Sequence, residues 1–317
     1  MLIPVFPPIL LSTCANKVVG MLINFSPLLK ILATKPPKSP IIPPPTVMIV
    51  SFRLRLFLIR LSKRIFAFGC SMTRYRWPTW ADIYASDKTT QFYNYAHSGA
   101  GNQFIANQIV ETCKRFNWND DDLILIMWSS ITREDRYVTE IISGSKQEWN
   151  RNMPVNEHGK LKGGWLLPGN MYSQDLYDEE FVNQFSSEKG YLMRDLATIK
   201  LTESFLSNFK YKMFQMAPFE CVDEDHLNQV YQIYDKPNYP CLLDCIGGEW
   251  PHIKCTYDDS YDSDRHPDPS MHFEFLRYAG MQTTDSMREF ANKWQNKVSN
   301  SISHEEVGWD AGEVVRL

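Results

Sequence analysis

Residues 64–73 read RIFAFGCSMT, a short apolar run that ends at Gly69 and is followed almost at once by a serine. An apolar run of this length, closed by a glycine, is typical of a buried parallel strand. Three further short runs, at 92–95, 123–128 and 211–217, follow along the chain. The sequence therefore predicts four buried strands, each leading into a loop or turn.

Apolar residues at helical spacing separate or follow these runs, in the stretches 105–113, 192–206 and 287–298. In the last stretch, Ser286 and Glu289 form a predicted capping box ahead of the apolar helix face. Strands that alternate with helices predict a mostly parallel sheet covered on both faces. We expect a three-layer α/β/α sandwich with a sheet of about five strands.

Charge is distributed unevenly along the 317 residues, although the formal net charge is only -4. Residues 1–64 contain nine Lys and Arg and no Asp or Glu, whereas the rest of the chain has 24 basic and 37 acidic residues. An acidic body lacks the basic face that phosphate neutralisation requires. We therefore expect no nucleic-acid partner.

The N-terminal residues 1–63 differ in composition from everything after them, since ten of the 19 prolines fall in positions 1–45. No stretch supplies the roughly 20 uninterrupted apolar residues of a membrane span. No positive charge precedes Lys17, as it would in a signal peptide. We interpret 1–63 as a low-complexity, Pro-rich, basic leader that is disordered or not native, with Met48 as the alternative start, and favour a cytoplasmic location.

The remaining chain is predicted to form one domain at 64–298 and a polar C-terminal tail at 299–317. Two long stretches, near 137–187 and 219–263, interrupt the alternation of strands and helices and are rich in Trp, Tyr, Asn and Asp. Loops of this length in a compact domain are usually functional or disordered. We interpret them as insertions that form the walls of a binding cleft.

The seven cysteines have no disulfide-framework spacing. The segment Cys241-x3-Cys245, followed by His252 and Cys255, has metal-ligand residue types but lacks the tight C-x2-C pairs common in zinc sites. We expect reduced thiols, no metal and no cofactor.

Three polar segments follow predicted strands or precede the last helical region, where open α/β sheets place their ligands. In the first, Ser71 follows the turn at Gly69; a serine here is more often a helix cap than a nucleophile. Cys70 is a rival nucleophile that strand alternation would turn away. The second, 94–102, is a glycine-rich turn with accessible backbone N–H groups, and it lacks the phosphate-loop pattern.

The third segment contains Asp264 and His266, two residues apart. A serine nucleophile needs a base to remove its proton, and the base needs a carboxylate that fixes its tautomer. One loop can supply both groups. His272 is the alternative base, and a solvated polar turn is the competing interpretation of the segment.

In their order along the chain, these segments resemble the blocks of the SGNH (GDSL-type) hydrolase family, particularly uncharacterised members from phage and marine sequences. The resemblance covers about residues 64–298 and implies an SGNH, flavodoxin-like fold. It makes Ser71 the nucleophile and the N–H groups of Ser71 and Gly99 oxyanion donors. The Gly and Asn of the family's third block are Trp128 and Ser130 here, so Ser130 or Asn102 would replace the side-chain donor.

The resemblance implies a serine esterase or acyl hydrolase that acts on a small-molecule or glycan ester through an acyl-serine intermediate. His266 would take the proton of Ser71, and Asp264 would orient His266. The Gly-x-Ser-x-Gly elbow of an α/β-hydrolase is absent. The altered first and third blocks favour the alternative, a non-catalytic binding or structural protein of the same fold, such as a virion component. A phosphate- or nucleotide-binding protein has only the turn at 99–102 in its favour, and no oligomeric state is indicated.

Overall fold

A computed structural model describes residues 64–310, except for gaps at 89, 141–161, 168, 172–176, 178, 222 and 254–263. The predicted leader, much of the two predicted insertions and Cys255 lie outside the described residues. The functional segments predicted after the strands all lie within them.

The central sheet consists of four parallel strands in the order β2-β1-β3-β6. The strands are β1 (Arg64–Phe68), β2 (Gln91–Asn94), β3 (Asp122–Trp128) and β6 (Lys210–Gln215). A single parallel bridge from Gln215 to Cys241 continues the sheet beyond β6. The predicted parallel sheet is confirmed; of the expected five or so strands, the described residues form four and this one bridge.

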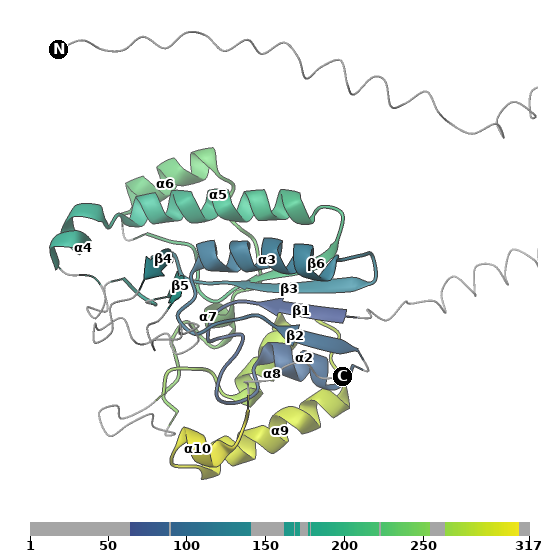
Figure 1. The fold of residues 1–317 in the computed structure, drawn as a ribbon. Coiled ribbons are helices and arrows are strands. Elements are labelled where there is room, and N and C mark those ends of the chain that lie inside the picture. The colour runs from purple at the N-terminus through teal and green to yellow at the C-terminus, as the bar shows by residue number, and fades with distance from the viewer. Residues whose placement is uncertain are drawn as a thin grey trace, which may run out of the picture. The chain divides into compact units, whose positions relative to one another are not determined.

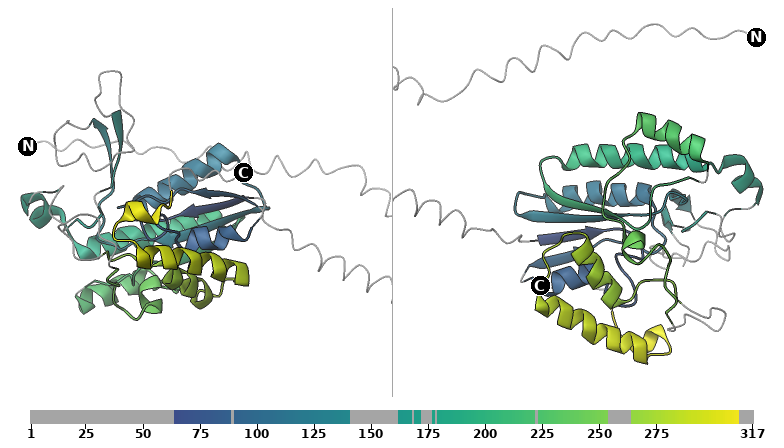
Figure 2. Two further views of the ribbon diagram at one scale, coloured as in Figure 1. Left: turned by 90° about the horizontal axis from the view of Figure 1, so that it is seen from below. Right: turned by 180° about the vertical axis from the view of Figure 1, so that it is seen from behind.

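Helices cover both faces of the sheet, with α3 and α5 on one side and α2, α8 and α9 on the other (Figure 1). The view from behind shows the same three layers (Figure 2). The helices of the described residues are α2 (Trp80–Ser86), α3 (Asn102–Phe116), α4 (Glu179–Phe185), α5 (Glu188–Leu206), α6 (Glu224–Ile233), α7 (Leu242–Cys245), α8 (Pro269–Tyr278), α9 (Asp285–Asn300) and α10 (His304–Val307). The domain is therefore the predicted α/β/α sandwich.

The middle strands β1 and β3 are apolar because they are buried on both faces: Phe66, Phe68, Ile124 and Ile126 have no exposed surface. At the amino ends of these strands, Arg64 forms a bidentate ion pair with the buried carboxylate of Asp122. Nη2 lies 2.6 Å from Oδ2, and Nε lies 2.8 Å from Oδ1. Such a bidentate pair fixes the register between β1 and β3. The carboxyl ends of both strands consequently open at one edge of the sheet.

The start of α9 differs from the prediction. The N-cap is Thr284, whose hydroxyl accepts a hydrogen bond from the Met287 amide at 3.2 Å, and Ser286 lies inside the helix. The predicted capping box of Ser286 and Glu289 is therefore wrong. Threonine is also a good cap, and a cap at Thr284 adds helical residues before the apolar face begins.

The first insertion contains the antiparallel pair β4 (Arg136–Glu140) and β5 (Lys162–Leu166). Trp165 of β5 packs edge-on against Phe104 of α3, with ring centroids 5.8 Å apart. This contact holds part of the insertion beside the start of α3.

The segment 299–317, predicted as a polar tail, contains α10. Val307 of α10 is fully buried in a cluster with Trp77, Trp294 and Val298. This part of the tail is packed, because His304 and Val307 of α10 are both buried. Among the described residues, no helix has the length and apolar character needed to cross a membrane.

Candidate active site

Ser71 lies in the turn that directly follows β1, and only 6% of its surface is exposed. The turn is tight: the amides of Thr73 and Arg74 both donate to the Cys70 carbonyl, at 2.9 and 3.2 Å. A Cβ atom at Gly69 would lie 2.1 Å from the Thr73 hydroxyl oxygen, so the turn requires glycine there. Within the described part of the chain, neither the amide nor the hydroxyl of Ser71 forms a hydrogen bond.

Cys70, the rival nucleophile, has no exposed surface. Its sulfur contacts the Met216 sulfur at 3.5 Å, inside the core beyond the end of β6. The Cys70 thiol thus lies inside the core, whereas Ser71 keeps a small exposed surface.

Asp264 and His266 are joined as the sequence predicts, with Nδ1 of His266 2.8 Å from Oδ1 of Asp264. The His266 amide also donates to Oδ1, at 2.7 Å. A carboxylate can only accept hydrogen bonds, so the proton of this pair is on Nδ1, and Nε2 of the neutral ring is left as the basic nitrogen. This is the tautomer that a general base beside a serine needs.

The other carboxylate oxygen of Asp264, Oδ2, accepts hydrogen bonds from the Tyr75 hydroxyl and from Nε2 of His304, the latter at 2.8 Å. Burial alone would raise the pKa of Asp264, but these hydrogen bonds and that of His266 outweigh it and hold the pKa well below its usual range. Asp264 is therefore a carboxylate at neutral pH. Its backbone is fixed as well, by two hydrogen bonds with Ile253 at 2.7 and 2.8 Å.

Tyr75 connects the serine turn to the Asp/His loop. It follows Ser71 by four residues, and its ring stacks on the His266 ring with centroids 3.7 Å apart. Trp77 strengthens the same junction, since its indole N–H donates to the Pro267 carbonyl at 2.8 Å. The two segments that carry the predicted serine, acid and base are therefore neighbours, although 189 residues separate Tyr75 from Asp264.

His266 and Ser71 are both described by the structure, and the predicted hydrogen bond between their side chains is not formed. Catalytic hydrogen bonds are often long without a ligand and shorten only when substrate is bound. The serine–histidine contact stays a prediction.

His272, the alternative base, lies on α8 with no exposed surface and with no hydrogen bond to either ring nitrogen in the described structure. Burial lowers the pKa of His272 to about 3. Without a carboxylate partner to set its tautomer, His272 is the weaker candidate, and the geometry favours His266.

Gly99 has a left-handed backbone, with φ +79°, in the turn before α3. A hydrogen bond from the His97 amide to the Gly69 carbonyl, at 3.1 Å, fixes this turn beside the serine turn. The Gly99 N–H forms no hydrogen bond with other described residues. It thus retains the free donor that the predicted oxyanion role requires.

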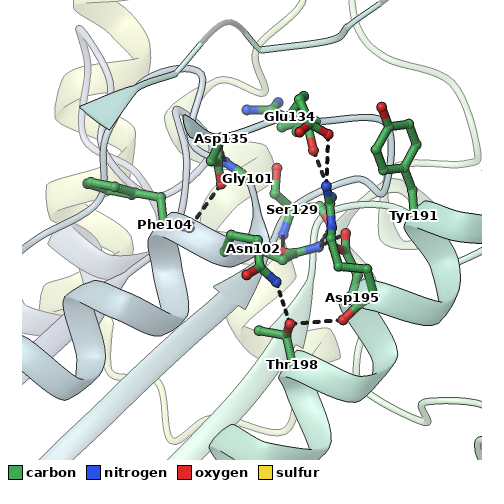
Figure 3. Close-up of polar contacts among 12 residues, drawn as sticks. Gly101, Asn102, Phe104, Ser129, Glu134, Asp135, Tyr191, Asp195 and Thr198 are labelled. Carbon is green, nitrogen blue, oxygen red and sulfur yellow. Dashed lines mark hydrogen bonds and ion pairs between the residues drawn. The ribbon is translucent and has the colours of Figure 1, made fainter. Parts of the chain in front are cut away.

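Asn102 does not suit the oxyanion role that the sequence suggested. Its side-chain amide donates to the Ser129 carbonyl at 3.1 Å and to Asp195 Oδ2 at 2.7 Å, and its oxygen accepts from the Ser129 amide at 2.8 Å (Figure 3). Both amide hydrogens are used, so Asn102 has no donor left for substrate. Ser130, the other candidate, is half-buried, and its hydroxyl makes no hydrogen bond with the described residues.

A polar network behind Asn102 was not predicted from the sequence (Figure 3). Asp135 caps α3 by accepting from the amides of Gly101 and Phe104, at 2.8 and 2.9 Å. Burial raises the pKa of Asp195 to about 6, although Arg194 and Asn102 oppose the shift. The one feature of the sequence that indicates this network is Asp195, an acidic residue on the apolar face of a predicted helix.

Arg133 extends this network toward the turn at Gly99. Its guanidinium donates to the Ala100 carbonyl at 2.9 Å and lies 3.9 Å from the Met216 sulfur. Among the described residues, no carboxylate forms an ion pair with it within 4.0 Å. Arg133 thus places a positive charge near the carboxyl edge of the sheet.

The residues named for a metal site do not form one in the described structure. Cys241 precedes α7 and is buried, which raises the pKa of its thiol to about 11. No group of three or more His, Cys, Asp or Glu side chains in the described ranges is arranged to hold a metal ion.

The fold and the site together define an α/β/α protein with an Asp–His pair and a serine turn at the carboxyl edge of a parallel sheet. Two solved structures are similar to it. One is a member of the lipolytic protein G-D-S-L family from Veillonella parvula, with 14% identity and a TM-score of 0.31, covering 68% of this chain and 95% of that chain. The other, described as a GDSL-like lipase from Parabacteroides merdae, has 12% identity and a TM-score of 0.35, covering 70% of this chain and 97% of that chain.

No protein-family model matches the chain. No curated protein matches it either.

Proposed function

We propose that the protein is a serine esterase or acyl hydrolase of the SGNH type that acts on a small or carbohydrate-linked acyl ester. The observation that carries this proposal is the Asp264–His266 pair, whose His266 ring stacks on Tyr75 from the serine turn. A polar surface turn would not need a buried carboxylate whose two oxygens are both hydrogen-bonded. A histidine that acts as a general base beside a serine needs such a carboxylate, which orients the ring and stabilises the imidazolium.

In the proposed reaction, the Ser71 oxygen attacks the ester carbonyl while Nε2 of His266 takes the hydroxyl proton. Asp264 stabilises the imidazolium that forms. The N–H groups of Ser71 and Gly99 donate to the oxyanion, and His266 then gives its proton to the departing alcohol. Water, deprotonated by the same nitrogen, cleaves the acyl-serine ester and regenerates Ser71.

The side chains of the first insertion favour a sugar-bearing substrate over a long-chain lipid. Tyr137 of β4 is 65% exposed, and its ring meets that of Trp165 with centroids 5.8 Å apart. An exposed tyrosine offers a flat apolar ring with a polar hydroxyl at its tip, a combination that suits a sugar ring with its own apolar face and hydroxyl groups. A lipase would instead need a broad apolar surface for the acyl chain.

Labelling with a fluorophosphonate probe tests the proposal, because the probe reacts with an activated serine. We expect one modified peptide, carrying the label on Ser71, and no labelling of Ser71→Ala. Cys70→Ala is the matched control, and it should be labelled like the unchanged protein because the Cys70 thiol is buried.

Hydrolysis of p-nitrophenyl acetate, an acetylated glycan and a long-chain ester then separates the substrate classes. Acetate and glycan esters should be cleaved faster than the long-chain ester. Absence of both labelling and turnover in the folded protein would favour the alternative, a non-catalytic protein of the same fold.

A further inference from the structure

The two oxygens of the Asp264 carboxylate are divided between two histidines. Oδ1 is 2.8 Å from Nδ1 of His266, and Oδ2 is 2.8 Å from Nε2 of His304. Asp264 is 8% exposed and His304 is 5% exposed, so the second hydrogen bond is shielded from water. Since Oδ2 can only accept, Nε2 of His304 must carry the proton.

His304 is held in place by its surroundings. Its ring packs against Trp77 and, edge-on, against Tyr75, with centroids 5.6 and 5.9 Å apart. Val307, one turn further along α10, is buried beside Trp77 and Trp294. The helix that carries His304 is therefore anchored to the same aromatic cluster that supports the Asp/His loop.

We propose that His304 is a positioning residue for the catalytic pair: it holds Oδ2 of Asp264 so that Oδ1 stays directed at His266. This inference rests on the proposed function, since it assigns His304 a part in the same site. The C-terminal segment would then be a component of the active site.

Among the described residues, three titratable side chains form hydrogen bonds with the Asp264 carboxylate, so the loss of one donor should be measurable. Tyr75 faces the carboxylate from the serine turn, His266 from its own loop and His304 from α10. His272 of α8 lies close enough to interact electrostatically with His266. Within the part of the chain that the structure describes, Tyr75 and His304 are the two donors to Oδ2.

His304→Phe and His304→Gln separate the hydrogen bond from the packing. Phenylalanine keeps an aromatic ring against Trp77 and removes the donor, whereas glutamine can keep an N–H near the position of Nε2. A hydrogen bond to a charged group contributes enough that His304→Phe should lower kcat by on the order of tenfold to a hundredfold, with KM little changed. His304→Gln should restore most of the lost turnover.

The pH profile provides a readout that a purely structural role would not change. Without the donor on Oδ2, Oδ1 is no longer held against Nδ1, so the carboxylate stabilises the protonated His266 ring less and the ring loses its proton at lower pH. The acid limb of kcat/KM should therefore move to lower pH in His304→Phe and stay near its original position in His304→Gln. Glu305→Gln, at an exposed position of the same helix, is the control and should change neither kcat nor the limb.

An NMR pH titration of the His266 ring signals keeps this inference separate from the proposed function, because it needs no substrate. A downward shift of the midpoint in His304→Phe supports the positioning role even if no ester is cleaved, in which case the proposed function fails alone. A folded His304→Phe protein with unchanged kcat and an unchanged midpoint overturns the inference. If His304→Phe does not fold, His304→Asn, whose amide is too short to reach Oδ2, takes its place with the same two expectations.

Discussion

Gly99 occupies a position at which two separate constraints require glycine. Its φ of +79° lies in the left-handed region, which L side chains rarely adopt. A Cβ atom there would also lie 2.5 Å from the Leu167 carbonyl oxygen. Any side chain at Gly99 would push the turn away from Leu167 and move the N–H that we assign to the oxyanion.

Replacing Gly99 with valine should lower turnover of p-nitrophenyl acetate by on the order of 100- to 1000-fold, the usual cost of losing one oxyanion donor. Gly280→Val is the matched control: φ is +66° there, but nothing lies within 4 Å of the added Cβ atom. It should lower the free energy of unfolding by about 1–3 kcal/mol from backbone strain and leave turnover intact.

Ser130→Ala should lower turnover less than about tenfold, because a flexible hydroxyl is a weaker preorganised donor than a fixed backbone N–H. Circular dichroism and thermal unfolding should first show that all three variants are folded. If Ser130→Ala abolishes turnover while Gly99→Val retains it, the oxyanion assignment is wrong.

Between elements, one side chain joins three parts of the fold. Asn102, at the start of α3, makes hydrogen bonds to both main-chain groups of Ser129 after β3 and to Asp195 of α5. These groups are fully buried, so each lost partner would leave an unsatisfied polar group in the core. Asn102 therefore fixes how α3 and α5 meet the carboxyl end of β3.

Asn102→Ala should lower the free energy of unfolding by roughly 3 kcal/mol, since it leaves buried partners without hydrogen bonds. Asn107→Ala removes an amide from the same helix at an exposed site, where its one hydrogen bond to a described residue is the donation to the Gln103 carbonyl. That control should change stability by less than about 0.5 kcal/mol. Equal urea midpoints for the two variants would show that the network does not hold the elements together.

The parts of the site that the sequence could predict are those set by local spacing. An apolar run predicts a strand, and a carboxylate and an imidazole two positions apart can meet, as Asp264 and His266 do. The partners on Oδ2 were not predictable, because Tyr75 and His304 join Asp264 across 189 and 40 residues. Asn102 was misassigned because its sequence position gives no sign that Ser129 and Asp195 use both of its amide hydrogens.

At the scale of the whole molecule, the parallel sheet brings distant segments to one edge. The serine turn follows β1, the turn at Gly99 follows β2, and the Asp/His loop precedes α8. The order of these segments along the chain could be predicted from the sequence. The contribution of α10 could not, because a four-residue helix in a polar segment has too little periodicity to be recognised.

We therefore expect truncation at the N-terminal end to change little and truncation at the C-terminal end to lower both stability and turnover. A chain that begins at Met48 should unfold at the same temperature as the full chain and keep its turnover, because the four-stranded sheet and the proposed catalytic residues lie after residue 63.

A chain that ends at Ser301 should unfold at a lower temperature, because removing Val307 uncovers Trp77, Trp294 and Val298. It should also lose at least as much turnover as His304→Phe, since the donor to Oδ2 of Asp264 is deleted together with its helix. Thermal unfolding and ester hydrolysis, measured side by side on both truncated chains, check these expectations. Full turnover in the chain ending at Ser301 would mean that Tyr75 alone is sufficient to orient the carboxylate.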